Sequence, residues 1–182
     1  MFPKAHAAAY VMMALRVAWF KVYKPLAYYA AYFGIRAKAF DYETMCQGKE
    51  KLEYFMADLK RKKADNTASP KDEASLGDMK IVQEMYARGF EFLPIDIYKA
   101  KAHDFQIIDG KLMPALDSIE GLGEKAAEAF VEAVEAQEGQ PFVSKNEMRE
   151  KTKITKTVIE TMSDLHLLEG MPEDSQLSIF DF

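Results

Sequence analysis

The stretch that decides the fold is Leu116-Asp117-Ser118-Ile119-Glu120-Gly121-Leu122-Gly123-Glu124-Lys125-Ala126-Ala127. Two glycines flank one apolar residue, and a helix then opens with Lys and Ala, which is the spacing of a helix-hairpin-helix element. The glycines allow a tight turn, so that backbone N–H groups at the start of the next helix can approach a phosphate closely. The apolar residues expected to hold the two helices together are Leu116, Ile119 and Leu122. The residues expected to contact phosphate are Gly121, Leu122, Gly123 and Lys125. The alternative is an ordinary helical corner with a glycine turn.

A second, weaker copy of this element follows. Ser144 can cap a helix with Glu147 three residues later, a capping box, and a turn at 152–154 leads into a second helix. Basic and hydroxyl side chains cluster at the start of that helix and could meet a phosphate: Lys153, Thr155, Lys156 and Thr157. The copy lacks paired glycines, so core packing with a solvated lysine face is the alternative interpretation.

Charge is distributed unevenly along the chain. Residues 1–63 carry 12 basic and 5 acidic side chains, whereas 64–182 carry 12 basic and 24 acidic ones. The basic third is the natural candidate for contact with polyanions, although solvated helix faces would give the same pattern. From Asp104 onward there are 7 basic and 17 acidic residues. DNA contact in that region must therefore be local, through backbone amides and Lys125.

The N-terminal part of the chain, far before the helix-hairpin-helix spacing, is expected to be helical. Apolar residues at spacings of three and four predict an amphipathic helix over Pro3–Tyr23, with Tyr10, Met13, Val17 and Phe20 in one stripe. Further helices are expected over Pro25–Phe33, ended by Gly34, and over Lys49–Lys63. The polar residues 64–78, which include Pro70, indicate a solvated loop or linker.

The middle of the chain predicts a short β-hairpin. A helix is expected over Met79–Arg88, ended by Gly89, followed by an extended segment 90–98. The pair Asp109-Gly110 suits the tight turn between two short strands in 105–113. Beyond Pro114 the pattern is helical in short pieces. The predicted fold is mainly α with a small β hairpin, a helical N-terminal segment followed by a tandem helix-hairpin-helix domain.

Composition excludes several classes of protein. The chain has 182 residues, 49% of them apolar, and its one cysteine, Cys46, excludes a disulfide framework or a zinc site of paired cysteines and favours a reducing, cytoplasmic environment. The apolar run 5–20 is interrupted by Arg16 and falls short of the roughly 20 residues of a membrane span. Three histidines are scattered, His6, His103 and His166. Without paired carboxylates in a strand context or a glycine-rich lysine motif for phosphate, we expect no catalysis by this chain alone.

The last seven residues, Gln176-Leu177-Ser178-Ile179-Phe180-Asp181-Phe182, follow a polar stretch. Apolar side chains at a polar terminus need something to bury them, either the core of the chain or the groove of a partner. A glutamine followed by apolar residues and an aromatic suits an extended peptide that binds a pocket. A terminus that packs back on the chain is the alternative.

Several motifs together resemble a known family. FPKAHAAAYVMMALRVAWFKVYKPLAYYAAYF, EMYARGFEFLPIDIYKAKAHDFQIIDGKLMP, IEGLGEKAAEAF and QLSIF occur in this order. They closely resemble the C-terminal end of the PolC-type DNA polymerase III α subunit of low-GC Gram-positive bacteria. The resemblance covers essentially the whole chain, and the last motif has the same terminal position.

The resemblance implies a division of the chain into functional regions. Residues 1–63 are expected to be the C-terminal part of the polymerase fingers, 64–78 a linker or loop, 79–170 the duplex-DNA-binding region, and 171–182 a clamp-binding tail. The implied clamp-binding residues are Gln176, Leu177, Ser178, Ile179 and Phe180, where family members usually carry Leu in place of Ile179. The residues implied at the incoming nucleotide are Phe2, Lys4 and His6.

The resemblance also implies what lies outside this chain. The palm with its metal-binding aspartates, the 3′–5′ exonuclease and the cysteine zinc site are expected upstream, so that Met1 is expected to be an internal residue of the parent. The cofactor would be magnesium in the parent and none in this chain. The implied partners are duplex primer-template DNA, the β sliding clamp, a deoxynucleoside triphosphate and the rest of the polymerase. The alternative is a free-standing helix-hairpin-helix adaptor between DNA and clamp.

Overall fold

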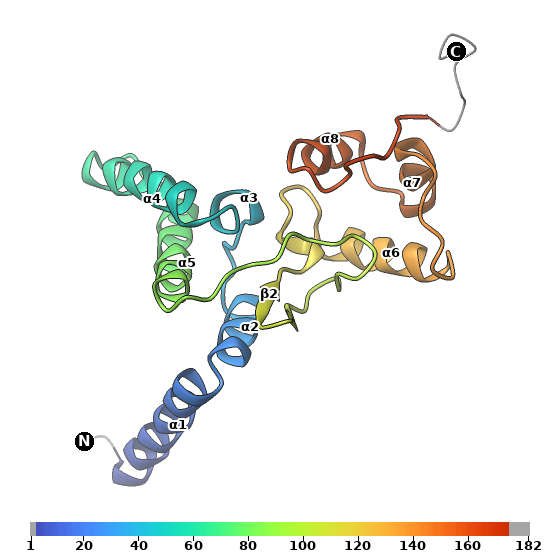
Figure 1. Cartoon of the computed structure of the whole chain (residues 1–182). Coiled ribbons are helices and arrows are strands. Elements are labelled where there is room, and N and C mark those ends of the chain that lie inside the picture. The colour runs from blue at the N-terminus through green and yellow to red at the C-terminus, as the bar shows by residue number, and fades with distance from the viewer. Residues whose placement is uncertain (1–2, 175–182) are drawn as a thin grey trace.

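The computed structural model describes residues 3–174. In chain order the elements are α1 (Lys4–Tyr23), α2 (Pro25–Ile35), α3 (Tyr42–Met45), α4 (Lys49–Ala64), α5 (Pro70–Ala87), β1 (Gln106–Ile108), β2 (Lys111–Met113), the 3-10 turn η1 (Leu116–Ser118), α6 (Glu124–Glu135), α7 (Lys145–Thr152) and α8 (Lys156–Asp164). In Figure 1, α4 and α5 lie on one side of β2 and α6 to α8 on the other, while α1 projects away. The predicted fold class, mainly α with a small β-hairpin, is confirmed.

The β-hairpin forms where the sequence predicts it. Asp109 and Gly110 both have positive φ, 49° and 77°, as a primed two-residue turn requires. The turn pairs β1 with β2 in antiparallel register, with Gln106 opposite Met113. Phe92 forms a parallel bridge to Leu112, and the Leu93 amide donates to the Leu112 carbonyl at 2.7 Å. The predicted extended segment therefore borders β2.

Strand β2 stands between two apolar cores. Its consecutive residues Leu112 and Met113 belong to different cores, because successive side chains of a strand point to opposite faces. Leu112 packs with buried residues of α2, α4 and α5, among them Tyr29, Leu52, Met56, Met79 and Val82. Met113 packs with the helix-hairpin-helix region, which contributes Leu116, Ile119, Leu122, Phe130, Val158 and Met162. The hairpin thus joins the N-terminal helices to the C-terminal ones.

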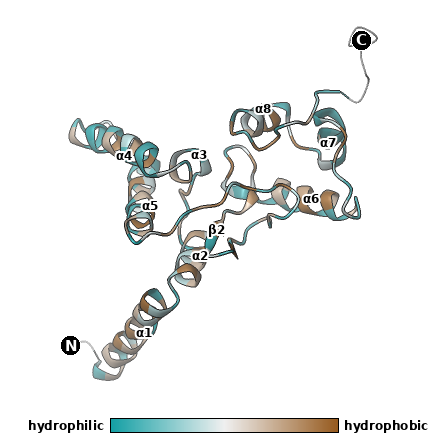
Figure 2. Ribbon diagram, viewed as in Figure 1, coloured by the Kyte–Doolittle hydropathy of each residue, from teal (hydrophilic) through white to brown (hydrophobic). Residues whose placement is uncertain are grey.

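Helix α1 is present as predicted, but its apolar stripe faces solvent. None of its residues is buried, and Tyr10 and Met13 are 65% and 57% exposed. Figure 2 shows hydrophobic stretches along the projecting helix. Its C-terminal end is bound to α5 and the residue after α5: Lys21 Nζ lies 2.7 Å from Glu84 Oε2, and Arg88 donates to the Lys21 carbonyl at 2.9 Å. Neither α1 nor any other helix within residues 3–174 is long and apolar enough to cross a membrane.

Helix α2 extends beyond the glycine that was expected to end it. It runs through Gly34 to Ile35, so that prediction was wrong. A Cβ at Gly34 would lie 3.3 Å from the His103 carbonyl oxygen and 3.8 Å from Phe105. The glycine is therefore placed where the loop before β1 approaches the helix closely, and not where the helix ends.

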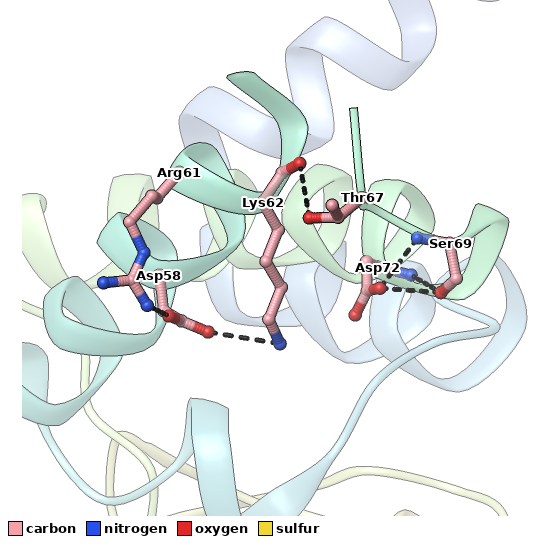
Figure 3. A network of polar contacts seen from close by, with 6 residues as sticks. All are labelled: Asp58, Arg61, Lys62, Thr67, Ser69 and Asp72. Carbon is pink, nitrogen blue, oxygen red and sulfur yellow. Dashed lines mark hydrogen bonds and ion pairs between the residues drawn. The ribbon is translucent and has the colours of Figure 1, made fainter. Parts of the chain in front are cut away.

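The loop predicted over 64–78 was wrong for residues 70–78, which belong to α5. Ser69 Oγ accepts a hydrogen bond from the Asp72 amide at 3.1 Å, and Asp72 Oδ2 accepts one from the Ser69 amide at 2.8 Å (Figure 3). This capping box, with Pro70 at the first helical position, starts the helix despite its polar composition. Leu76 and Met79 are then buried in the core shared with α4. The functional division of the chain stays a prediction.

Candidate nucleic-acid interface

The first hairpin is anchored by the three predicted apolar residues. Leu116, Ile119 and Leu122 are at most 1% exposed, and the Leu122 amide donates to the Ile119 carbonyl at 3.1 Å. The arm before the turn is shorter than expected, because η1 is a single 3-10 turn and not an α-helix. Since the Leu122 side chain is buried, only its backbone can contact a ligand.

The start of α6 has no side-chain cap. Gly123 occupies the N-cap with φ −71° and ψ 166°, and no side chain bonds to the first amides. The amides of Ala126 and Ala127 donate to the Gly123 carbonyl at 2.9 Å, so the N–H groups of the two residues before them, Glu124 and Lys125, remain for solvent or an anion. A Cβ at Gly123 would meet nothing within 4 Å, and Lys125, two residues later, is exposed. Three of the predicted phosphate-contacting residues, Gly121, Gly123 and Lys125, are therefore exposed together, while Leu122 between the glycines is buried.

The two glycines of the turn serve different purposes. Gly121 has φ +83°, a conformation that residues with a side chain rarely adopt, and an added Cβ would lie 3.4 Å from Val158 Cγ2 of α8. Gly123 has an ordinary φ and open space in front of it. Gly121 is thus required by the backbone conformation of the turn, with room for a Cβ at ordinary contact distance from α8, whereas Gly123 leaves the amides uncovered.

The second element consists of α7 and α8, joined by the short turn 153–155. Ser144 Oγ accepts from the Glu147 amide at 3.2 Å, as predicted. The other half of the expected box differs: Glu147 Oε2 accepts from the Val143 amide at 2.6 Å and not from Ser144. The donor to the Glu147 carboxylate is therefore the amide of the residue before Ser144. The reach of a glutamate side chain covers both positions.

The turn of the second element gathers the predicted residues. Lys153 ends α7 with φ 60°, and Thr155 caps α8 by accepting from the Val158 amide at 3.3 Å. Lys156 lies 3.5 Å from Glu160 one turn later. Four side chains at this turn are exposed: Lys153, Thr155, Lys156 and Thr157. The cap occupies the Thr155 oxygen and one α8 amide, so this site offers lysine side chains more than free backbone donors.

A cleft of about 730 Å³ lies between the first hairpin and helices α4 and α5. Lysines line it, but each of two is paired: Lys62 lies 3.2 Å from Asp58, and Lys71 lies 4.0 Å from Glu120 of the hairpin. Figure 3 shows Asp58 between Arg61 and Lys62 at this edge. The cleft therefore has mixed charge and is not a basic groove.

The sequence pattern does not predict one polar cluster, which forms around His103. His103 Nδ1 lies 2.8 Å from Asp117 Oδ2, and His103 Nε2 lies 3.2 Å from Glu128 Oε1. Hydrogen bonds to Asp117, and to a lesser degree Glu128, raise the pKa of His103 above its ordinary value. The partners are 14 and 25 residues away along the chain, so no local motif reveals them.

The remaining candidates lie elsewhere. Lys4 and His6 are in the first turn of α1, where His6 packs edge-on against Tyr10 with ring centroids 4.7 Å apart. This end of α1 lies far from α6 to α8 in Figure 1. Phe2 and the tail 176–180 are outside the described residues. Within residues 3–174, no three His, Cys, Asp or Glu side chains form a group that could hold a metal ion.

We expect Gly121→Ala to lower the free energy of unfolding by about 1–2 kcal/mol, because the turn forces a left-handed conformation on the new side chain. Gly123→Ser is the matched control. Serine is a good N-cap and the local backbone is extended, so this variant should match or slightly exceed the wild type. Denaturant unfolding followed by circular dichroism measures both. Equal losses in the two variants would contradict the distinct roles of the glycines.

Comparison with known proteins agrees with this geometry. A family described as "Helix-hairpin-helix motif" matches residues 89–176. "DNA polymerase III PolC-type" of Streptococcus mutans is 50% identical over 182 residues, and those of Streptococcus suis and Streptococcus pneumoniae are 49% and 48% identical over 181 residues. In each case all of this chain is covered, but it spans only about 12% of the length of the relative. Over its whole length, the chain thus matches a segment of PolC-type DNA polymerase III, with the helix-hairpin-helix motif in its second half.

Proposed function

We propose that this chain is the part of a bacterial replicative DNA polymerase that holds duplex primer-template DNA. The observation that carries the proposal is the exposed, uncapped start of α6 behind the Gly121–Gly123 turn. Amides at a helix start donate to phosphate oxygens without reading bases, as a polymerase that copies any sequence requires. The lysines at the start of α8 supply a second set of phosphate contacts.

The exposed surface of α1 favours a segment of a larger polymerase over a free-standing adaptor. A helix with an apolar stripe and no buried residue leaves a surface that soluble proteins normally cover. We propose that the rest of the polymerase chain covers this surface of α1. In the same proposal, Phe2, Lys4 and His6 contribute to the pocket of the incoming deoxynucleoside triphosphate.

We assign the chemistry to residues outside this chain. Polymerisation transfers a nucleotidyl group to a 3′ hydroxyl with two magnesium ions held by carboxylates. The isolated chain should therefore not extend a primer. Primer extension with magnesium and four deoxynucleotides measures this, and incorporation above a control without protein would contradict it.

The same proposal places the sliding clamp at the C-terminal tail. Gln176 would donate and accept hydrogen bonds, Leu177 and Ile179 would make apolar contacts, and Phe180 would fill the deepest pocket, with Ser178 between them. A short peptide loses chain entropy on binding, so the clamp contact gains most when DNA is held at the same time.

For duplex binding, we predict that Gly123→Asp weakens affinity at least about tenfold, the loss expected when a hydrogen bond to a charged group is replaced by repulsion. The same change should keep or raise stability, because aspartate caps a helix and favours its positive end. Lys125→Ala should lower the slope of log affinity against log salt by about one. Fluorescence anisotropy of labelled duplex over a salt series measures both.

The controls are Gln140→Asp, which adds the same charge at an exposed position after α6, and Lys80→Ala, which removes an exposed lysine from α5. Both should bind duplex with less than about a twofold to threefold change in affinity at moderate salt, since neither lies at the hairpin. If Gly123→Asp binds like Gln140→Asp, the first element is a structural corner and the DNA assignment fails.

For the clamp, a peptide of Asp174–Phe182 should bind the bacterial β clamp, and Phe180→Ala should weaken binding by about 1–3 kcal/mol. Gln176→Ala should also weaken it, while Ser175→Ala, outside the five proposed residues, is the matched control. Isothermal titration measures the affinities. Equal binding by the wild-type and Phe180→Ala peptides would withdraw the clamp assignment.

A further inference from the structure

His103 lies across the base of the first hairpin. Its Nδ1 faces Asp117 of η1 at 2.8 Å, in the arm before the turn, and its Nε2 faces Glu128 of α6 at 3.2 Å, in the arm after it. The loop that carries His103 is itself bound to the first arm: the Leu116 amide donates to the Lys101 carbonyl at 2.9 Å and the Asp117 amide to the Ala102 carbonyl at 3.1 Å. The imidazole therefore connects both arms through one side chain.

This arrangement needs the doubly protonated ring. A carboxylate only accepts hydrogen bonds, and a neutral imidazole carries one N–H. With carboxylate oxygens at both nitrogens, the neutral ring would leave one lone pair facing a negative charge. Imidazolium donates to both, so the two contacts hold together only while His103 is charged.

The other charged groups around the ring do not replace this contact. Lys101, on the same loop, is paired with the carboxylate that follows His103: its Nζ lies 3.9 Å from Asp104 Oδ2. Lys38, which follows α2, and Glu124 at the start of α6 line the same cavity of about 500 Å³ as His103 and Asp117. The imidazolium is thus the cation that lies directly between Asp117 and Glu128.

We infer that His103 is a positioning residue for the DNA-contacting turn: its imidazolium joins Asp117 to Glu128, fixes the two arms of the hairpin and offsets two negative charges beside the uncapped start of α6. The inference rests on the proposed DNA-binding function. It predicts that duplex binding by this chain depends on pH through one histidine that touches no DNA.

The direction of the pH effect follows from the raised pKa of His103. A group whose pKa is higher in the folded protein contributes its full stabilisation below the unfolded value, about 6.5 for histidine, and loses it as pH rises through the folded value. Above that range one of the two contacts breaks, and the freed carboxylate repels phosphate near α6. Duplex affinity should fall accordingly.

The first measurement is independent of DNA. Titration of the histidine ring signals of the 182-residue chain by NMR should give His103 a pKa above that of an exposed histidine, and Asp117→Asn and Glu128→Gln should each lower it. After correction for the intrinsic rise of exchange with pH, the hydrogen-bonded amides of Ile119 and Leu122 should lose protection against exchange as His103 deprotonates. An ordinary pKa for His103, or one unchanged by both variants, would overturn the inference.

The second measurement is duplex affinity at pH 6.0 and pH 8.0 at constant salt. The wild type should bind about fivefold more weakly at pH 8.0, the lower end of typical coupling between two linked sites. His103→Gln should bind at both pH values as the wild type binds at pH 8.0. His166→Gln, a variant of an exposed histidine 3.2 Å from Glu169, should keep the wild-type pH dependence.

The outcomes separate this inference from the proposed function. If His103→Gln keeps the wild-type pH dependence while all variants bind duplex, His103 does not position the turn and DNA binding stands. If the wild type binds no duplex at either pH, the DNA-binding function fails and the positioning role fails with it. In that case a raised pKa of His103 would still show that the contact joins the two arms.

Discussion

Burial of Leu122 between two exposed glycines is the constraint on which the candidate interface depends. The chain reverses at this point, and Leu122 is 1% exposed while its neighbours Gly121 and Gly123 are at the surface. Inserting that one side chain into the core turns the adjacent backbone outward. Glycines on either side then leave the outward amides uncovered. The burial of Leu122 therefore explains both the apolar contact inside the turn and the polar surface outside it.

The same core explains how the interface is carried by the rest of the chain. Strand β2 sends Met113 into the core that holds Leu122 and Leu112 into the core of α2, α4 and α5. A displacement of the β1–β2 hairpin would therefore disturb packing on both sides of β2, since closely packed interiors transmit strain. Val158 of α8 belongs to the same buried cluster as Leu122, which joins the second element to the first. The two candidate phosphate sites thus form one packed unit.

Features determined by neighbouring residues could be predicted from the sequence. Asp109-Gly110 specifies its turn because both residues tolerate positive φ, and the spacing around Gly121 specifies the hairpin. Composition misled the prediction over 64–78, because Ser69, Pro70 and Asp72 are polar residues and at the same time a strong helix start. Gly34 was misread for a related reason: its absent side chain serves an approach by a loop about 70 residues later, which no local pattern contains.

Charge near the interface shows why the rest required a structure. The sequence places many carboxylates around α6, and an acidic flank beside a phosphate site is unfavourable by Coulomb repulsion. Spacing along the chain gives no sign that two of them, Asp117 and Glu128, meet the imidazole of His103. Once they do, the local charge at the base of the hairpin is less negative than the composition indicates. The acidic composition of this region and the proposed contact with a polyanion are compatible because the fold brings the His103 imidazole to two of the carboxylates beside the first hairpin.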